Sequence, residues 1–181
     1  MKRINKNLIQ THNNRIISFL KYSSFTLAML LSLTNIASSQ YWMKTYVPSP
    51  YNTNHWLDVY FLPNDPNYGW VCGFSGMVLR STDGGLTWQG AGISSAYQLE
   101  SIFFTSRTTG YCSGVEGVYK SIDGGKSWTE ISPDTSISYW GLHFVNDNIG
   151  VVLSGGCLNN VQKFFRTTDG GSTWSLFEAY E

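Results

Sequence analysis

Short runs of aromatic and β-branched residues alternate with polar loops along the chain after residue 40. One kind of run always ends in phenylalanine: "WLDVYF" ends at Phe61, "LESIFF" at Phe104 and "WGLHF" at Phe144. Runs this short, bounded by Gly, Pro, Asn or Asp, are typical of β-strands, and no sustained helical periodicity accompanies them. The pattern predicts an all-β chain.

The runs group into a unit that occurs three times. After each phenylalanine come a polar loop, a second run that starts at a glycine, a third short run, and a fourth run that starts at a tryptophan. The third and fourth runs are joined by "STDGGLTW", "SIDGGKSW" and "TTDGGSTW", whose aspartates, Asp83, Asp123 and Asp169, stand 40 and 46 residues apart. Four antiparallel strands in a repeat of this length are the content of one β-propeller blade. We therefore predict a β-propeller segment of about three four-stranded antiparallel blades, part of a larger ring.

The predicted organisation follows from these units. It comprises a signal peptide (1–39), a lone outer strand and linker (40–55), blade 1 (56–97), blade 2 (98–138) and blade 3 (139–181). Trp42 precedes Trp88 by the same 46 residues that separate Trp128 from Trp174, so "YWMKTYV" resembles a fourth strand with no blade ahead of it. Three blades leave three explanations: truncation of a longer protein, which is favoured, closure of a ring by self-association, or an open arc.

The first residues have the order of a secretory signal peptide. Basic residues lead into the apolar run 25–36, and Ala37 and Ser39 are small residues ahead of a cut before Gln40. Five of the twelve Lys and Arg, and none of the twelve Asp and Glu, lie in this leader, so the remaining chain has a formal charge of −5. The sequence therefore predicts an exported protein (secreted, periplasmic or at the cell surface), with membrane contact only through an uncleaved leader. The acidic balance argues against a nucleic-acid partner.

The three cysteines, Cys72, Cys112 and Cys157, form no metal-binding pattern. They are widely spaced and are not clustered with histidines, so no zinc site is predicted. Buried thiols are the simplest expectation, and export leaves a disulfide open. We expect neither a cofactor nor a metal.

The repeated acidic turn has a structural explanation at every position. Glycine supplies the positive φ of a tight reversal, aspartate accepts backbone N–H bonds, Ser and Thr add hydroxyl contacts, and tryptophan anchors the hairpin. Turns on successive blades point outward, which separates the aspartates too far for paired-carboxylate catalysis, and one carboxylate per turn is too few for calcium. The predicted structural residues are Ser81, Asp83, Gly85, Trp88, Ser121, Asp123, Gly125, Trp128, Thr167, Asp169, Gly171 and Trp174.

These turns carry the pattern S/T-x-D-x-G-x-x-W, which resembles the Asp box, or BNR repeat, of sialidases, xyloglucanases, sortilin-like receptors and photosystem II assembly factors. Glycine followed by an aromatic, and later by "VLRSTDGGLTW", is most similar to the Ycf48/Hcf136-like repeats over residues 41–177. The resemblance implies a non-enzymatic propeller that assists the assembly of a membrane protein complex. The chain departs from that family in having three blades instead of about seven, and only Arg80, Arg107 and Arg166 after the leader in place of an arginine-rich face. The photosystem role itself is therefore not predicted.

The first run of each unit is expected to be innermost, where a propeller's central channel holds ligands. Counting back from the phenylalanines places Tyr60, Phe103 and His143 at one level, and Asp58 at another with Ser101 and Gly141. The candidate ligand-binding residues are Trp56, Asp58, Tyr60, Trp140 and His143. The aromatic rings would stack on a sugar and Asp58 would accept its hydrogen bonds, while packing in the core is the competing interpretation.

Two functions fit these residues. The first is an exported, non-enzymatic binding or scaffold module with an unknown protein or glycan partner, with self-association to close a ring as a further option. The alternative is a glycoside hydrolase of the sialidase or xyloglucanase type, or a carbohydrate-binding propeller fragment. No catalytic residue is assigned, because the two channel carboxylates, Asp58 and Glu100, stand at different levels of the strands. We predict the non-enzymatic module.

Overall fold

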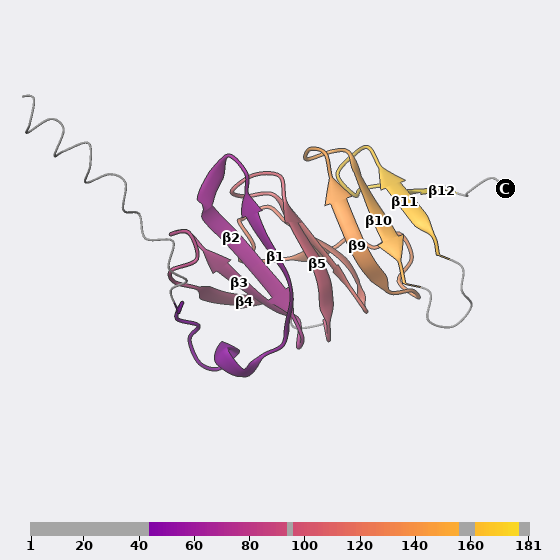
Figure 1. Cartoon of the computed structure of the whole chain (residues 1–181). Coiled ribbons are helices and arrows are strands. Elements are labelled where there is room, and N and C mark those ends of the chain that lie inside the picture. The colour runs from indigo at the N-terminus through magenta and orange to yellow at the C-terminus, as the bar shows by residue number, and fades with distance from the viewer. Residues whose placement is uncertain (1–43, 94–95, 156–161, 178–181) are drawn as a thin grey trace, which may run out of the picture. The chain divides into compact units, whose positions relative to one another are not determined.

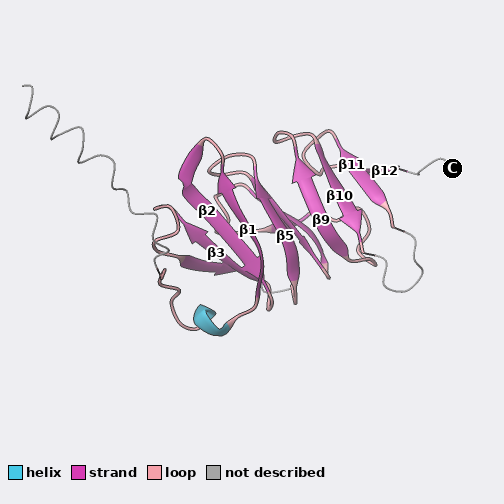
Figure 2. Cartoon of the chain, viewed as in Figure 1, coloured by secondary structure: helices cyan, strands magenta, loops and turns pink. Residues whose placement is uncertain are grey.

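A computed structural model of the chain describes residues 44–93, 96–155 and 162–177. Strands dominate these residues, and one short 3-10 turn, η1 (Tyr51–Thr53), precedes them (Figures 1 and 2). The predicted signal peptide, residues 1–39, lies outside the described residues and stays a prediction.

Within the described residues, twelve strands form three four-stranded antiparallel sheets, each hydrogen-bonded in chain order. Blade 1 contains β1 (Trp56–Leu62), β2 (Asp65–Gly73), β3 (Met77–Ser81) and β4 (Gln89–Gly92). Blade 2 contains β5 (Leu99–Phe104), β6 (Gly110–Gly114), β7 (Gly117–Ser121) and β8 (Thr129–Glu130). Blade 3 contains β9 (Tyr139–Phe144), β10 (Gly150–Ser154), β11 (Phe164–Thr167) and β12 (Ser175–Phe177). The prediction of three four-stranded antiparallel blades is confirmed.

The inner strands β1, β5 and β9 lie side by side and bring the blades together (Figure 1). Between blades 1 and 2, the Phe104 ring stacks on Trp70 with centroids 3.6 Å apart; between blades 2 and 3, Phe144 stacks on Tyr111 at 3.5 Å. All four side chains are buried. We call these two contacts between neighbouring blades the first and the second seam. Each seam joins the phenylalanine of one blade to the aromatic that follows a glycine in the preceding blade.

The glycine that opens the second strand makes room for the stacked phenylalanine. A Cβ at Gly110 would lie 2.3 Å from the Phe104 ring, and a Cβ at Gly150 would lie 2.4 Å from the Phe144 ring. Both distances are far below van der Waals contact, so each ring lies flat against bare backbone. The glycine–aromatic pair of the sequence is therefore a packing requirement.

The buried apolar side chains gather in two clusters, one at each seam. The first cluster comprises Leu62, Trp70, Cys72, Val78, Ile93, Ala96, Leu99, Ile102, Phe104, Cys112 and Tyr119. The second comprises Val118, Tyr139, Val152 and Phe165. Removal of this apolar surface from water is the main term that holds neighbouring blades together.

The first hairpin is tighter than the sequence pattern predicts. The pattern placed a loop over "LPNDPNY" and a strand start at Gly69, whereas β2 begins at Asp65. Leu62 pairs with Asp65 across the hairpin, so only Pro63 and Asn64 remain as the turn. Because Phe61 already pairs with Gly69, residues 66–68 form an irregularity between this end pair and the regular ladder.

The expected lone outer strand is not a regular strand where the structure describes it. Residues 41–43 lie outside the described residues, and 44–47 contain a single parallel bridge, from Tyr46 to Thr87. Thr45 Oγ1 donates to the carbonyl oxygen of Gly85 at 2.5 Å. Among the described residues, this segment therefore contacts the hairpin of blade 1 through Thr45 and Tyr46.

Thr45 nevertheless lies where a preceding blade would place its fourth strand. It follows Trp42 by three residues, as Ile131 follows Trp128. Ile131 accepts a hydrogen bond from Trp174 Nε1 at 2.7 Å, and its side chain lies against Gly171 of the next blade. The segment that begins at residue 44 therefore covers the outer part of blade 1 in the manner of the end of a blade.

Candidate ligand-binding groove

The turns that join the first two strands of each blade gather at one end of the sheets (Figure 1). Together they line a groove of about 680 Å³. Its lining residues are Tyr60, Leu62, Pro63, Asn64, Asp65, Phe103, Phe104, Thr105, Ser106, Arg107, Phe144, Val145, Asn146, Asp147 and Asn148. A volume of this size suits a small ligand or a short peptide segment.

Each Asp-box hairpin (residues 81–88, 121–128 and 167–174) supports the neighbouring turn of its own blade. The N–H of the first box glycine donates to a carbonyl oxygen of that turn or the start of the next strand: Gly84 to Asn67, Gly124 to Thr108 and Gly170 to Asn148, at 2.8 to 2.9 Å. Each of these glycines has a positive φ, between 70° and 79°, which glycine adopts without steric cost. The repeated motif thus fixes the turns that form the groove.

The aspartate organises the hairpin from inside. In blade 1, Ser81 Oγ donates to Asp83 Oδ1 at 2.8 Å and accepts from the Gly85 N–H at 2.9 Å. The backbone N–H of Thr87 and its hydroxyl donate to the two oxygens of Asp83 at 2.9 and 2.5 Å. The hairpins of blades 2 and 3 repeat this arrangement. Every oxygen of the carboxylate is therefore engaged within its own turn.

These hydrogen bonds keep the box aspartates ionised. Donation from the Thr87 and Ser81 side chains lowers the pKa of Asp83 to about 2, and Thr173 does the same for Asp169. Burial opposes ionisation of Asp123, but the hydrogen bonds from Ser127 outweigh it and its pKa is also about 2. A carboxyl with so low a pKa holds no proton to give near neutral pH, which argues against a general-acid role.

A row of aromatic rings runs along the inner strands beside the groove. The Tyr60 and Phe103 ring centroids are 4.6 Å apart, and those of Phe103 and His143 are also 4.6 Å apart. The three residues come from β1, β5 and β9 at the same level, as counting along the runs had placed them. Tyr60 and Phe103 line the groove, and burial raises the pKa of Tyr60, so its hydroxyl remains protonated.

The rim of the groove is polar and held in place. Arg107 Nε lies 2.6 Å from Asp65 Oδ2, which links the turns of blades 1 and 2. The Arg107 guanidinium also lies over the Tyr68 ring, 4.6 Å from its centroid. On the other side, Thr105 Oγ1 donates to Asp147 Oδ1, which links the turns of blades 2 and 3. Preformed loops lower the ordering cost of binding a ligand.

Three further hydrogen bonds fix the turn of blade 3. The Tyr111 hydroxyl donates to the Asp147 carbonyl oxygen at 2.8 Å. Burial, and then the charge of Asp147, raise the pKa of Tyr111 to about 12, so this donor keeps its proton. Asn146 Oδ1 accepts from the N–H groups of Asn148 and Ile149, both at 2.9 Å, in an Asx turn.

The other sequence-predicted site residues lie elsewhere. Trp56 and Asp58 line a separate, smaller hollow of about 210 Å³ together with Leu57, Val59 and Val71. The Asp58 carboxylate accepts from the Ile102 N–H at 2.9 Å and from Ser101 Oγ at 3.2 Å, so it ties β1 to β5. Trp140 lies near the start of β9, half exposed, where its ring meets Gly155. The structure thus places Tyr60 and His143 in one row and does not join Trp56 and Trp140 to it.

Sequence reasoning missed the rim residues Asn64, Asp65, Arg107, Asn146 and Asp147. A signal was available, because each follows the phenylalanine of a first run in the polar loops "LPNDPNY", "TSRTT" and "VNDNI". Equivalent loops of stacked blades must share one end of the sheets. Loops placed by a rigid scaffold commonly carry binding residues.

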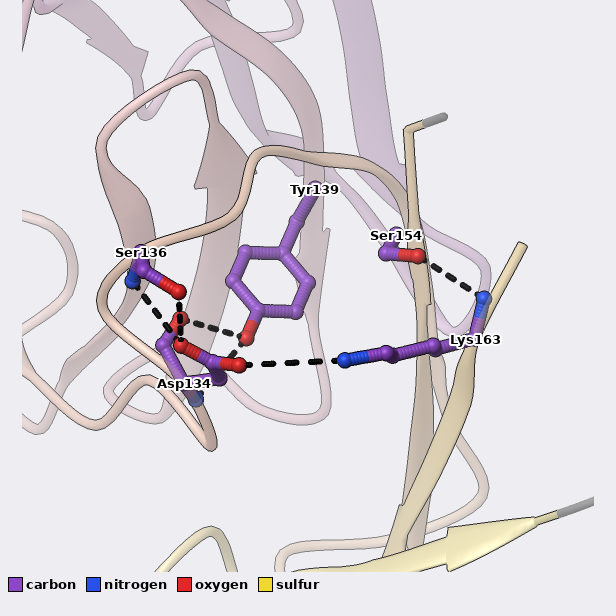
Figure 3. Close-up of polar contacts among 5 residues, drawn as sticks. All are labelled: Asp134, Ser136, Tyr139, Ser154 and Lys163. Carbon is purple, nitrogen blue, oxygen red and sulfur yellow. Dashed lines mark hydrogen bonds and ion pairs between the residues drawn. The ribbon is translucent and has the colours of Figure 1, made fainter. Parts of the chain in front are cut away.

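The opposite end of the sheets is closed by a hydrogen-bonded linker between blades 2 and 3 (Figure 3). The Tyr139 hydroxyl donates to the Asp134 carbonyl oxygen at 2.8 Å and accepts from the Asp134 N–H at 2.9 Å. Hydrogen bonds from Ser136 lower the pKa of Asp134, whose Oδ2 lies 3.9 Å from Lys163 Nζ. These contacts serve the linker and leave the groove as the better candidate for binding.

The part of the chain that the structure describes contains neither a metal-binding cluster nor an exposed cysteine. No group of three or more His, Cys, Asp or Glu there could hold a metal ion. Cys72 and Cys112 are buried free thiols at the first seam, and Cys157 lies outside the described residues. The same described residues contain no helix of the length and apolarity needed to cross a bilayer.

Structural comparison places this arrangement among known propellers. A structure of YCF48 bound to D1 peptide aligns with 68% of this chain and 40% of its own, at a TM-score of 0.57 and 25% sequence identity. An ancestral GH74 enzyme aligns with 68% of this chain and 18% of its own, at a TM-score of 0.61 and 19% identity. The low identity to the enzyme supports a shared fold alone.

Sequence comparison identifies the family. The photosystem II assembly protein Ycf48 of Synechococcus sp. (strain JA-2-3B'a(2-13)) is 30% identical over 136 residues, which cover 74% of this chain and 39% of the relative. The photosystem II assembly lipoprotein Ycf48 of Synechococcus sp. (strain CC9902) is 31% identical over 123 residues, which cover 65% of this chain and 35% of the relative. This chain therefore spans well under half the length of either relative. The family profile described as photosynthesis system II assembly factor YCF48 matches residues 34–176, and the chain belongs to this family.

Proposed function

We propose that the chain is an exported, non-enzymatic module that holds a segment of a partner protein in the groove during assembly of a larger complex. The observation that carries the proposal is the groove itself: an aromatic floor under a polar rim, built from three turns that the Asp boxes hold in place. A preformed apolar floor with a few fixed polar groups is the usual form of a binding site.

The chemistry of the rim favours a polypeptide segment. The amide side chains of Asn64, Asn146 and Asn148 can pair with the N–H and C=O groups of an extended backbone. Tyr60 and Phe103 offer an apolar surface for side chains of the bound segment. A relative of known structure has been observed with a peptide, and relatives are named as assembly proteins, which supports a peptide ligand.

Export is the second part of the proposal. The basic and apolar order of residues 1–39 is that of a signal peptide, and one relative is named a lipoprotein. Cleavage ahead of Gln40 would release the propeller segment outside the cytoplasm. Sequencing the N-terminus of the protein recovered from a secreting host tests this: a mature chain that begins at Gln40 supports it, and an intact Met1 contradicts it.

The binding proposal is tested by a pair of matched substitutions. Val145 lines the groove and Ile122 lies in the hairpin of blade 2, and both side chains are 74% exposed. Short peptides selected from a phage-displayed random library should bind the wild type, and their Kd should rise at least about tenfold in Val145→Asp and stay unchanged in Ile122→Asp. Equal loss in both variants, or selection of no peptide, would overturn the proposal.

The hydrolase alternative has its own test. Incubation with a panel of polysaccharides should release no reducing ends, because the carboxylates of the groove rim are held in an ion pair and a hydrogen bond on separate turns. Release that disappears in Asp58→Asn would establish the alternative and exclude the non-enzymatic function.

A further inference from the structure

The side of blade 3 that faces away from blade 2 is apolar and exposed. We call it the open face and define it by the exposed side chains Val151, Leu153, Phe164, Arg166 and Phe177. The Val151 side chain is 40% exposed and Phe177 is 62% exposed. A hollow of about 440 Å³ lies among these residues and Phe165. Contiguous apolar surface of this kind is unusual on a monomeric protein.

Each residue of the open face has a counterpart in blade 2 that is covered by blade 3. The strand registers give the correspondence: Val151 matches Tyr111, Leu153 matches Ser113, Phe164 matches Val118, Arg166 matches Lys120 and Phe177 matches Ile131. Tyr111 stacks on Phe144, and Lys120 Nζ donates to the Gly170 carbonyl oxygen at 3.0 Å. The open face therefore has the arrangement of a seam, and no other blade among the described residues covers it.

Blade 1 presents the complementary surface on its own outward side. Val59, at 59% exposure, occupies the position of Ile102, and Val71 occupies that of Cys112. Ile102 and Cys112 are both buried in the first seam. Phe61 corresponds to Phe104, the ring that receives a stack from the preceding blade. Blade 1 thus retains half of a seam that blade 3 could complete.

We infer that the open face of blade 3 docks on the outward side of blade 1 in a second copy of this chain. Because the two surfaces differ, the contact is head to tail, and a reciprocal contact can close the pair. The described residues of two copies would form six blades, and closed propellers usually have four to eight. Val151 would lie over the Phe61 ring, and Arg166 would donate to the Gly84 carbonyl oxygen, as Lys120 does to Gly170.

At the outer edge of this contact, β12 of one copy and the segment 44–47 of the other would occupy the same place on the blade 1 hairpin. Phe177 corresponds to Ile131, yet the place that Ile131 takes on the next hairpin is held in blade 1 by Thr45. β12 contains only three residues, all exposed, so we expect it to yield to the segment 44–47 of the second copy. Strands β10 and β11 then form the body of the contact.

The mass of the purified full chain over a range of concentrations tests the inference, measured by light scattering after size exclusion. We expect the mass of two chains in the wild type. Val151→Asp and Phe164→Asp should each weaken association at least about tenfold, because a buried unpaired carboxylate opposes docking. Ile122→Asp also replaces an exposed apolar side chain with a carboxylate, but Ile122 lies outside the open face, so this variant should associate as strongly as the wild type. A wild type that stays monomeric, or that grows into open-ended chains, would overturn the closed pair.

Mixing variants tests the head-to-tail geometry. Val59→Asp damages only the blade 1 surface and Val151→Asp only the blade 3 surface, and each alone should be monomeric. In the mixture, one undamaged contact remains between the two kinds of chain, so a mixed dimer should form. Failure of the mixture to associate, while thermal melts show both variants folded, would exclude docking between these two surfaces.

Discussion

The two seams share one stacking geometry and differ in what surrounds it. The rings of Trp70 and Phe104 and those of Tyr111 and Phe144 lie nearly parallel, at interplanar angles of 4° and 6°. Among the described residues, the cluster at the first seam contains eleven buried side chains, Trp70 and Phe104 included, whereas at the second seam a cluster of four lies beside the buried rings of Tyr111 and Phe144. The repeat therefore conserves the contact while the apolar surface behind it changes.

As at the first seam, where Trp70 Nε1 donates to the Gly124 carbonyl oxygen at 2.9 Å, hydrogen bonds cross the second seam. Lys120 Nζ donates across it to the Gly170 carbonyl oxygen, and Trp174 Nε1 donates to the Ile131 carbonyl oxygen. It also carries a cost: the Ser113 hydroxyl is fully buried and, among the described residues, has no hydrogen-bond partner. The first seam has Cys72 at the equivalent position, which contacts the Leu99 carbonyl oxygen at 3.6 Å. Hydrogen bonds therefore position both seams, and the first seam buries more apolar side chains.

Truncation of a stacked aromatic side chain should give the largest loss in the free energy of unfolding, and the loss should differ between the two seams. Trp70→Ala removes a fully buried indole and its hydrogen bond to the Gly124 carbonyl oxygen, so we expect a loss of about 3–5 kcal/mol in the free energy of unfolding. Tyr111→Ala should cost about 1 kcal/mol less, because less apolar area leaves the core. Urea unfolding followed by tryptophan fluorescence measures both.

The control for this comparison is Trp140→Ala. The Trp140 side chain is half exposed and lies outside both clusters, so its truncation should cost far less than that of Trp70. If Tyr111→Ala proved the more damaging of the two seam variants, polar contacts would outweigh apolar burial and the ranking of the seams would be reversed.

The sequence could predict the seams because their residues recur at fixed places in the unit. Glycine, an aromatic and a terminal phenylalanine appear in blades 1 and 2, and the level of Tyr60 with Phe103 follows from counting back from the phenylalanine. What could not be predicted is which neighbour each residue meets. Asp58 looks like a free channel carboxylate in the sequence, but it is engaged by β5 through backbone and hydroxyl donors 43 and 44 residues away.

The groove was harder to predict for the same physical reason. Its rim consists of turn residues with no shared identity, such as Asn64, Arg107 and Asp147. Their proximity arises only when three blades stack, and the Arg107–Asp65 pair joins residues 42 positions apart. A pattern within one repeat unit cannot reveal contacts between units.

Repair of the buried hydroxyl should give an intermediate effect and strengthen the second seam. Ser113→Ala removes an unpartnered polar group whose burial costs about 1–3 kcal/mol, so the free energy of unfolding should rise by about 1 kcal/mol. Ser113→Cys, which copies Cys72, should act in the same direction. Melting temperature measured by calorimetry is the readout.

The matched control is a buried serine that has its partner. Ser154 Oγ accepts from the Lys163 N–H at 2.8 Å, so Ser154→Ala should destabilise by about 1 kcal/mol (Figure 3). A fall in stability for both serine variants would show that the Ser113 hydroxyl contributes to the seam, and the cost assigned to it here would be wrong.

Lowering the pH should produce the smallest difference in stability between the seams, because the box aspartates that support them both have a pKa of about 2. The box of Asp123 supports the first seam, and the box of Asp169 supports the second. Both carboxyls have a folded-state pKa of about 2, whereas an unfolded chain has about 3.9. A lowered folded-state pKa favours the ionised folded form, so this stabilisation is complete above about pH 5 and is lost as the pH falls from about 4 towards 2.

Asp123→Asn and Asp169→Asn should each flatten that decline by a similar amount, since an amide does not titrate in this range. Melting temperatures of the wild type and both variants between about pH 6 and about pH 2 provide the comparison. The Asn side chain keeps one acceptor for the Ser127 or Thr173 donors, so the hairpin should still form at neutral pH. If Asp123→Asn flattened the curve of melting temperature against pH far more than Asp169→Asn did, the two hairpins would contribute unequally to stability. The unequal apolar clusters alone would then not account for the difference between the seams.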